Sequence, residues 1–172
     1  MTTKLIEGLT EVINIAFGAD KLRIQPQTRD WCRLPYPLHP KGCKNYGKKP
    51  GCPPTAPALG DFFDLTHSVG FTIIKFDIEK YIIRRRETYP DLTDRQARCC
   101  ICWQGAVRKI LKAAVGGILA QNEALIWTDC PEAMGLNVLR TLNLIGIPAK
   151  KNPKQFVYKV AMLGYRKSRG EQ

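Results

Sequence analysis

Cysteines are the residues of this chain best suited to site chemistry, and there are seven of them. Cys32, Cys43 and Cys52 fall in a stretch rich in proline and lysine, CRLPYPLHPKGCKNYGKKPGCPPTAP, residues 32–57. Cys130 follows a short apolar segment and directly precedes a proline. Because thiolates are strong ligands for zinc and for iron–sulfur clusters, we predict that Cys32, Cys43, Cys52 and Cys130 bind a metal.

The composition of residues 32–57 explains why a metal is expected there. Ordering an irregular segment costs about 1–2 kcal/mol of backbone entropy per residue, and few apolar side chains are present to offset that cost. A thiolate-bound metal contributes about 10 kcal/mol or more. Four thiolates satisfy either metal centre; we favour an iron–sulfur cluster, of the 4Fe–4S type, with zinc as the alternative. The competing interpretation is that these cysteines are small buried hydrophobes or surface thiols.

A second group of cysteines, Cys99, Cys100 and Cys102, lies near the start of an expected helix. Residues three apart share one face of a helix, so Cys99 and Cys102 are either further metal ligands or a redox-active dithiol. Cys100 projects about 100° away from that face, and we expect it in the core. An odd number of cysteines in a reducing compartment argues against structural disulfides.

The segment CKNYGKKPGCPP resembles the C-x-x-Y-G-x-x-x-x-C-P-P signature of a family of predicted metal-binding proteins, a cysteine-rich domain of unknown function. Cys43, Tyr46, Gly47, Cys52 and the two prolines that follow match it. The segment CPEAMGLNVLRTLNLIGIP, which begins at Cys130, is similar to the C-terminal element of that family. The resemblance implies a thiolate-bound metal centre, iron–sulfur in kind, and specifies no reaction. The chain departs from the family where closely spaced cysteines precede that element, because only Cys130 remains there.

Basic residues surround the first group of cysteines. Lys41, Lys44, Lys48 and Lys49 flank them, and the whole chain has a formal net charge of +12. Such an excess attracts polyanions, so we expect an anionic small molecule or RNA as the partner. The run of arginines at positions 84–86 fans around a helix, and we expect it to form a solvated face.

These features lead to two functional hypotheses. The first is a cysteine-ligated iron–sulfur protein that acts by redox or sulfur chemistry on a small anionic metabolite or an RNA base, as an oxidoreductase or a sulfur-transfer enzyme. The alternative is a non-catalytic, zinc-stapled module that binds nucleic acid. No catalytic residue stands out, and the sequence contains neither a G-x-x-x-x-G-K-[ST] nor a G-x-G-x-x-G motif for a nucleotide cofactor.

Regular elements must position these cysteines, and apolar periodicity with capping signals predicts their order. The expected elements are a helix at 4–17, a short strand at 21–26, a helical turn at 61–67, a strand at 70–79, a long helix from Thr93 with a Thr93–Gln96 capping box, a strand at 124–128, a helix from Pro131 to Gly146 and a strand at 155–166. This alternation favours an α/β or α+β layered fold, in which a small sheet of about four strands packs against helices and carries a long cysteine-rich metal loop.

Length and composition are those of an ordinary globular protein. Hydrophobic residues make up 44% of the chain and charged residues 24%, close to typical values. We expect a single metal-binding domain over residues 1–172. No apolar run approaches the ~20 residues needed to cross a bilayer, and the first residues lack the pattern of a secretory signal. We therefore expect a cytoplasmic location.

Overall fold

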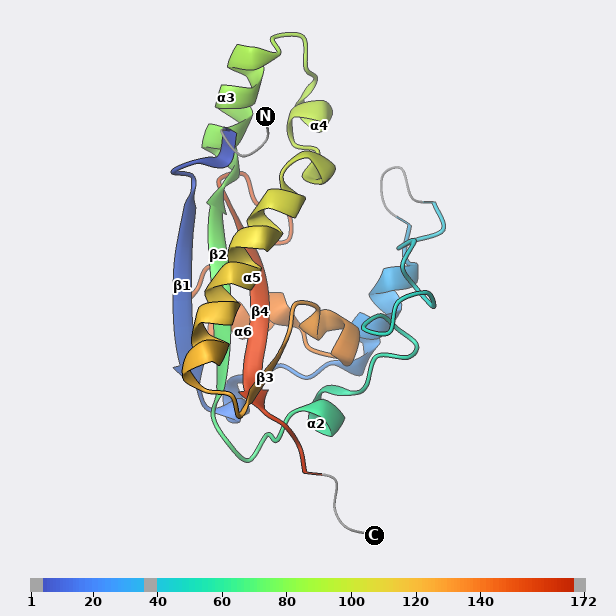
Figure 1. Ribbon diagram of the computed structural model, residues 1–172. Coiled ribbons are helices and arrows are strands. Elements are labelled where there is room, and N and C mark those ends of the chain that lie inside the picture. The colour runs from blue at the N-terminus through green and yellow to red at the C-terminus, as the bar shows by residue number, and fades with distance from the viewer. Residues whose placement is uncertain (1–4, 36–39, 169–172) are drawn as a thin grey trace.

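Four antiparallel strands form the centre of the structure, a computed structural model that describes residues 5–35 and 40–168 (Figure 1). Their order across the sheet is β1-β2-β4-β3. The strands are β1 (Thr10–Phe17), β2 (Val69–Asp77), β3 (Leu125–Thr128) and β4 (Phe156–Tyr165). This confirms the predicted layered fold with about four strands and packed helices, and the antiparallel pairing makes it the α+β form.

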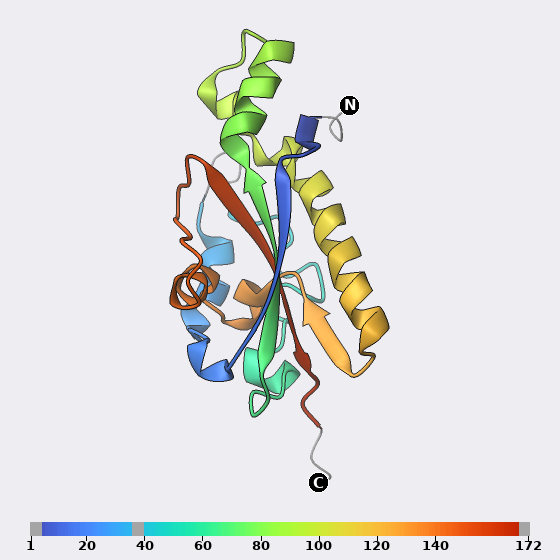
Figure 2. The same cartoon turned by 90° about the vertical axis from the view of Figure 1, so that its left-hand side faces the viewer.

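The two faces of the sheet are covered by different elements (Figure 2). On one face lies α5 (Gln104–Gln121), which buries Val107, Leu111 and Val115 against the strands. The opposite face is covered by α2 (Leu59–Phe62), η4 (Pro131–Met134) and α6 (Val138–Leu144). Two hydrophobic clusters result, one on each side of the sheet.

The central strand β2 contributes to both clusters because successive side chains point to opposite faces. Phe71 and Ile73 lie in the cluster beneath α6, and Ile74 and Phe76 lie in the cluster beneath α5. All four are essentially inaccessible to solvent. The segment is therefore recognisable as a strand from its nearly continuous run of apolar residues.

Helix α3 (Ile78–Thr88) follows β2 directly, and α4 (Asp94–Ala97) comes next. The capping box predicted for Thr93 and Gln96 is present at the start of α4. The long helix expected from Thr93 is nevertheless wrong as a single element, since a short turn, η3 (Cys100–Cys102), separates α4 from α5. Trp103 is buried at that break, and the centre of its ring lies 5.0 Å from the centre of the Phe76 ring.

The helix predicted at residues 4–17 is also wrong, because residues 10–17 form β1. Val12, Ile13 and Ile15 are β-branched, which favours a strand, and β1 pairs along its whole length with β2. Ile13 and Ile15 pack onto the core, whereas Val12 stays 46% exposed. The short strand expected at 21–26 is reduced to one isolated bridge, between Ile24 and Leu136.

The helix expected from Pro131 to Gly146 is divided into η4 and α6. Gly135 adopts a left-handed conformation with φ 97°, and the side chain of Asn137 then caps α6 by accepting a hydrogen bond from the amide of Arg140. The predicted end is confirmed, since Gly146 has φ 84° just after α6. Asn137 and Gly135 therefore start a new helix where apolar periodicity alone indicated continuity.

The segment between β1 and α2 first packs on the core through Ala19 and Leu22, and then runs away from the sheet (Figure 1). It begins with η1 (Ala19–Lys21) and η2 (Pro26–Arg33) and then follows turns to α2. We call residues 26–58, apart from the four that the structure does not describe, the cysteine arm. Among the described residues, no helix has both the length and the apolar character needed to span a membrane.

Candidate metal centre

The root of the cysteine arm is hydrogen-bonded to the segment that contains η4. The hydroxyl of Thr28 donates to the carbonyl of Glu132 at 2.9 Å, and the amide of Gln25 donates to the carbonyl of Gly135 at 2.7 Å. The side-chain amide of Asn137 donates to Oε1 of Gln25 at 2.9 Å. Thr28 and Asn137 are both buried, so the arm is held at this root by sequestered polar contacts.

Backbone hydrogen bonds then bring distant parts of the arm together. The amide of Cys43 donates to the carbonyl of Cys32 at 2.7 Å, and the amide of Gly47 donates to the carbonyl of Pro53 at 2.8 Å. Gly42 has φ 78°, and a Cβ there would lie 2.5 Å from the carbonyl oxygen of Cys32. Only glycine fits such a close approach at a positive φ, so Gly42 allows the Cys32 and Cys43 backbones to meet.

The three thiols of the arm are close enough to interact electrostatically. Burial raises the pKa of Cys32, and the neighbouring Cys43 and Cys52 thiols and the Glu132 carboxylate raise it further. All three cysteines are partly exposed. The arm therefore gathers three of the four predicted ligands in one region, although turns and prolines separate them in sequence.

Cys130, the fourth predicted ligand, sits at the start of η4 in different surroundings. Its thiol lies 3.5 Å from a carboxylate oxygen of Asp129 and donates to it. Burial and the Asp129 charge raise the pKa of Cys130 to about 11, against the opposing charge of Lys159. Cys130 does not contribute to the pKa of Cys32, whereas Glu132 does.

Sequence reasoning treated Glu132 only as a residue suited to a helix N-terminus, and so missed it as a neighbour of Cys32. The sequence carries little sign that Glu132 lies near Cys32, because this proximity depends on the packing of η2 against η4. The donor set of three arm thiols and a carboxylate or thiol from η4 suits a thiophilic metal. Within the described residues, no three His, Cys, Asp or Glu side chains converge as they would around a bound ion.

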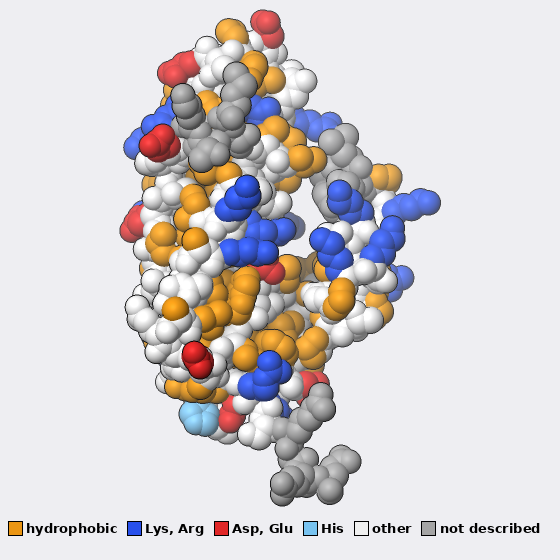
Figure 3. All heavy atoms as spheres, in the orientation of Figure 1, with side chains coloured by type: hydrophobic (Ala, Val, Ile, Leu, Met, Phe, Trp, Pro, Cys, Tyr) orange, Lys and Arg blue, Asp and Glu red, His pale blue; other side chains and the backbone are white. Residues whose placement is uncertain are grey.

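A hollow separates the cysteine arm from the rest of the molecule, and lysine and arginine side chains lie on both of its sides (Figure 3). Lys41, Lys44, Lys48 and Lys49 of the arm are all exposed. This arrangement favours a negatively charged ligand beside the arm thiols.

The second cysteine group lies between α4 and α5. Cys99 and Cys102 are partly exposed, and Cys100 is fully exposed. The expectation that Cys100 lies in the core is wrong, because burial of Trp103 ends the continuous helix on which that expectation depended. All seven thiols belong to described residues and are free.

The solvated face expected at the arginine run is present in part, since Arg86 is exposed and Arg84 and Arg85 are half-buried. Arg84 donates to the carbonyl of Glu7 at 2.7 Å, and Arg86 pairs with Asp94. Arg85 reaches the hydroxyl of Tyr81 at 3.3 Å. Arg84 and Arg86 thus link α3 to neighbouring segments, which spacing alone could not reveal.

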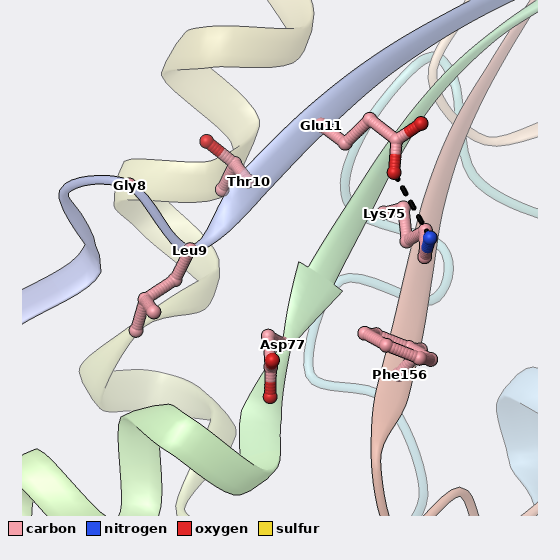
Figure 4. A pocket seen from close by; sticks show the side chains of 7 residues that line it. All are labelled: Gly8, Leu9, Thr10, Glu11, Lys75, Asp77 and Phe156. Atoms are coloured by element: carbon pink, nitrogen blue, oxygen red, sulfur yellow. Dashed lines mark hydrogen bonds and ion pairs between the residues drawn. The ribbon is translucent and has the colours of Figure 1, made fainter.

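A separate pocket of about 150 Å³ lies beside the start of β1 and the end of β2 (Figure 4). Within it, Nζ of Lys75 lies 2.9 Å from a carboxylate oxygen of Glu11 and 4.6 Å from the centre of the Phe156 ring. Lys75 and Glu11 are therefore already paired with each other in this pocket. None of the residues that line this pocket is a cysteine, so it offers no thiol ligand to a metal.

Comparison with known proteins gives no match to a family model, to a curated protein or to a solved structure.

Proposed function

We propose that the protein is an iron–sulfur protein whose cluster is held by Cys32, Cys43 and Cys52 of the cysteine arm, with Cys130 as the fourth ligand. The proposal is supported by one observation, the hydrogen bond from the Cys43 amide to the Cys32 carbonyl, which joins two arm cysteines that are distant in sequence. Cys52 is also near enough to raise the pKa of Cys32. Cysteines gathered in one part of the arm are suited to converge on one centre when a metal binds, because the metal removes the repulsion between neighbouring thiolates.

The reaction proposed is redox or sulfur chemistry on a small anionic molecule or an RNA base. A bound cluster supplies electron transfer or, at an iron with an open position, a Lewis acid. The protein's own contribution is to bind and orient the substrate. Exposed arm lysines attract its negative charge, and the Thr28 contact with η4 fixes the arm root beside Glu132 and Cys130.

The test is metal and acid-labile sulfide analysis of protein expressed and purified without oxygen, with absorption recorded near ~400 nm, where iron–sulfur clusters absorb. We expect brown protein with stoichiometric iron and sulfide. Cys43→Ala should lose most of both, and Cys130→Ala should lower cluster retention. Cys100→Ala, which removes a thiol outside the arm and η4, is the matched control and should retain the cluster.

A colourless protein that binds one zinc through the same thiols would overturn the iron–sulfur proposal and support the zinc-stapled module. The exposed lysines of the arm are the observation that favours this second candidate, because they supply affinity for a phosphate backbone without any reaction. A protein that binds neither metal, with all arm thiols free after anaerobic purification, would contradict both.

A further inference from the structure

A tight turn brings Cys99 and Cys102 together immediately before α5. The amide of Cys102 donates to the carbonyl of Cys99 at 3.1 Å. This bond between residues three apart closes a turn whose end Cα atoms lie within about 7 Å. Disulfides join Cα atoms that are roughly 4.4–6.8 Å apart, so this backbone can accommodate a bond between the two cysteines.

Both thiols lie near Tyr81 of α3. Burial raises the pKa of the Tyr81 hydroxyl, Arg85 lowers it, and Cys102 and Cys99 raise it. Burial lowers the pKa of the Arg85 guanidinium, but the neighbouring Cys102 thiol and Tyr81 hydroxyl raise it overall. Cys100 contributes to neither group and is exposed on its own. The turn therefore places Cys102 near the Arg85 cation, and both Cys99 and Cys102 near Tyr81.

We propose that Cys99 and Cys102 form a second reactive site, a dithiol that exchanges with the disulfides of small thiol compounds. Cys102 is the attacking residue and Cys99 is the resolving residue. Both are partly exposed, so a small disulfide can reach them. This site is separate from the metal centre proposed above and requires none of its ligands.

The exchange is balanced in two steps. The Cys102 thiolate attacks one sulfur of a disulfide RSSR, the S–S bond breaks, and RS⁻ leaves a mixed disulfide on Cys102. The Cys99 thiolate then attacks the Cys102 sulfur and expels the second RS⁻. The two protons lost by the protein thiols produce two RSH molecules. The protein is oxidised by two electrons, and the small disulfide is reduced by the same two.

Arg85 is a positioning residue in this scheme. A cation beside a thiol favours the thiolate, which is the attacking species. Its contact with the Tyr81 hydroxyl, at 3.3 Å, holds the guanidinium in place, and Tyr81 itself is buried. The N-terminus of α5, which begins two residues after Cys102, adds a positive dipole end close to it in the chain.

The first experiment treats the full-length protein with oxidised glutathione and maps its thiols by mass spectrometry after alkylation and trypsin digestion. Cleavage after Arg98 and Arg108 releases one peptide that contains all three cysteines of this group. We expect that peptide to lose two hydrogens and to regain them with a reductant. Cys100→Ser should still form the bond, whereas Cys99→Ser should stop at the mixed glutathione adduct.

The proposal is overturned if Cys99 and Cys102 are both alkylated after oxidation, or if Cys100→Ser abolishes the bond. Arg85→Gln provides a second test that is independent of bond mapping. The rate of adduct formation on the Cys99→Ser background should fall by up to about tenfold, because the thiolate fraction falls. Arg95→Gln removes an exposed cation from α4 instead and should leave the rate unchanged. Equal rates in the two arginine variants would remove the role given to Arg85.

A triple variant, Cys32→Ser with Cys43→Ser and Cys52→Ser, separates this inference from the proposed function. It should lose any metal and still exchange with oxidised glutathione at the parent rate. Loss of exchange in this variant, with circular dichroism matching the parent protein, would contradict an independent dithiol. Absence of metal from the parent protein would contradict the proposed function and leave the dithiol proposal unaffected.

Discussion

At the scale of single residues, the thiol of Cys130 is distinguished by what surrounds it. Burial and the adjacent Asp129 carboxylate raise its pKa from the ordinary value of 9.0 to about 11. The unfolded chain therefore loses this proton at a lower pH than the folded chain does. The stability linked to this group is complete below pH 9.0 and is lost as the pH rises toward about 11. A metal that binds Cys130 must first displace its proton.

Asp129→Asn tests this cause of the shift in metal-free protein. Asp129 raises the Cys130 pKa both through its charge and by accepting the thiol hydrogen bond. The neutral amide should lower that pKa, so alkylation of Cys130 by iodoacetamide at pH 9 should become severalfold faster. Asp91→Asn, at an exposed position before α4, is the control and should leave the rate unchanged. A slower or unchanged reaction in Asp129→Asn would show that the Asp129 carboxylate does not raise the pKa of Cys130.

At the scale of elements, strands with unambiguous local patterns were predictable and elements set by tertiary packing were not. β2, β3 and β4 were recognised from apolar, β-branched runs, and the α4 capping box was recognised from two residues. The apolar spacing of residues 4–17 suits a helix as well as a strand. Pairing of β1 with β2 decided between them, since long-range pairing outweighs weak local propensity.

The same distinction applies to the candidate site. The three arm cysteines could be grouped from the sequence because proline, glycine and thiols cluster within one stretch. Glu132 and Arg85 could not be assigned to the sites from the sequence. Each comes near a cysteine only through packing between elements that are separate in the chain. Glu132 lies near Cys32 because η2 packs on η4, and Arg85 of α3 lies near Cys102 in the turn before α5.

Thr28→Val tests whether the body of the protein holds the arm at its root. The Thr28 hydroxyl is buried and donates to Glu132 across η2 and η4. Valine keeps the shape but leaves that carbonyl without its donor, which should lower the free energy of unfolding by about 1–2 kcal/mol. Trypsin should also cleave after the arm lysines faster in the folded protein. Urea denaturation measures the change in the free energy of unfolding, and limited proteolysis measures the rate of cleavage in the arm.

Thr88→Val is the matched control for that substitution. Its hydroxyl donates to the carbonyl of Arg84 at 3.1 Å within α3 and is exposed. Because water replaces such a bond, the substitution should change the free energy of unfolding by no more than about 0.5 kcal/mol. It should also leave the rate of trypsin cleavage in the arm unchanged. Equal effects of the two substitutions would mean that the contact between η2 and η4 does not restrain the arm.

At the scale of the whole molecule, the distribution of charge matters more than its total. The net charge of +12 is shared by the entire chain, but the arm contributes exposed lysines beside the hollow that separates it from the sheet (Figure 3). Positive groups on both sides of a hollow reinforce one another's attraction for an anion. A polyanion should therefore bind chiefly along the arm and only weakly elsewhere.

Replacing Lys44, Lys48 and Lys49 with glutamate tests that localisation. Binding of a fluorescent single-stranded RNA, measured by anisotropy over a range of salt concentrations, should weaken at least tenfold. The slope of log K against log salt should fall by up to about 2, since each lost phosphate contact on single-stranded RNA contributes ~0.7. Replacing Lys150, Lys151 and Lys154, exposed on the connection between α6 and β4, gives a protein of the same net charge. If both triple variants lose affinity equally, the attraction comes from total charge, and the arm has no special role in binding RNA.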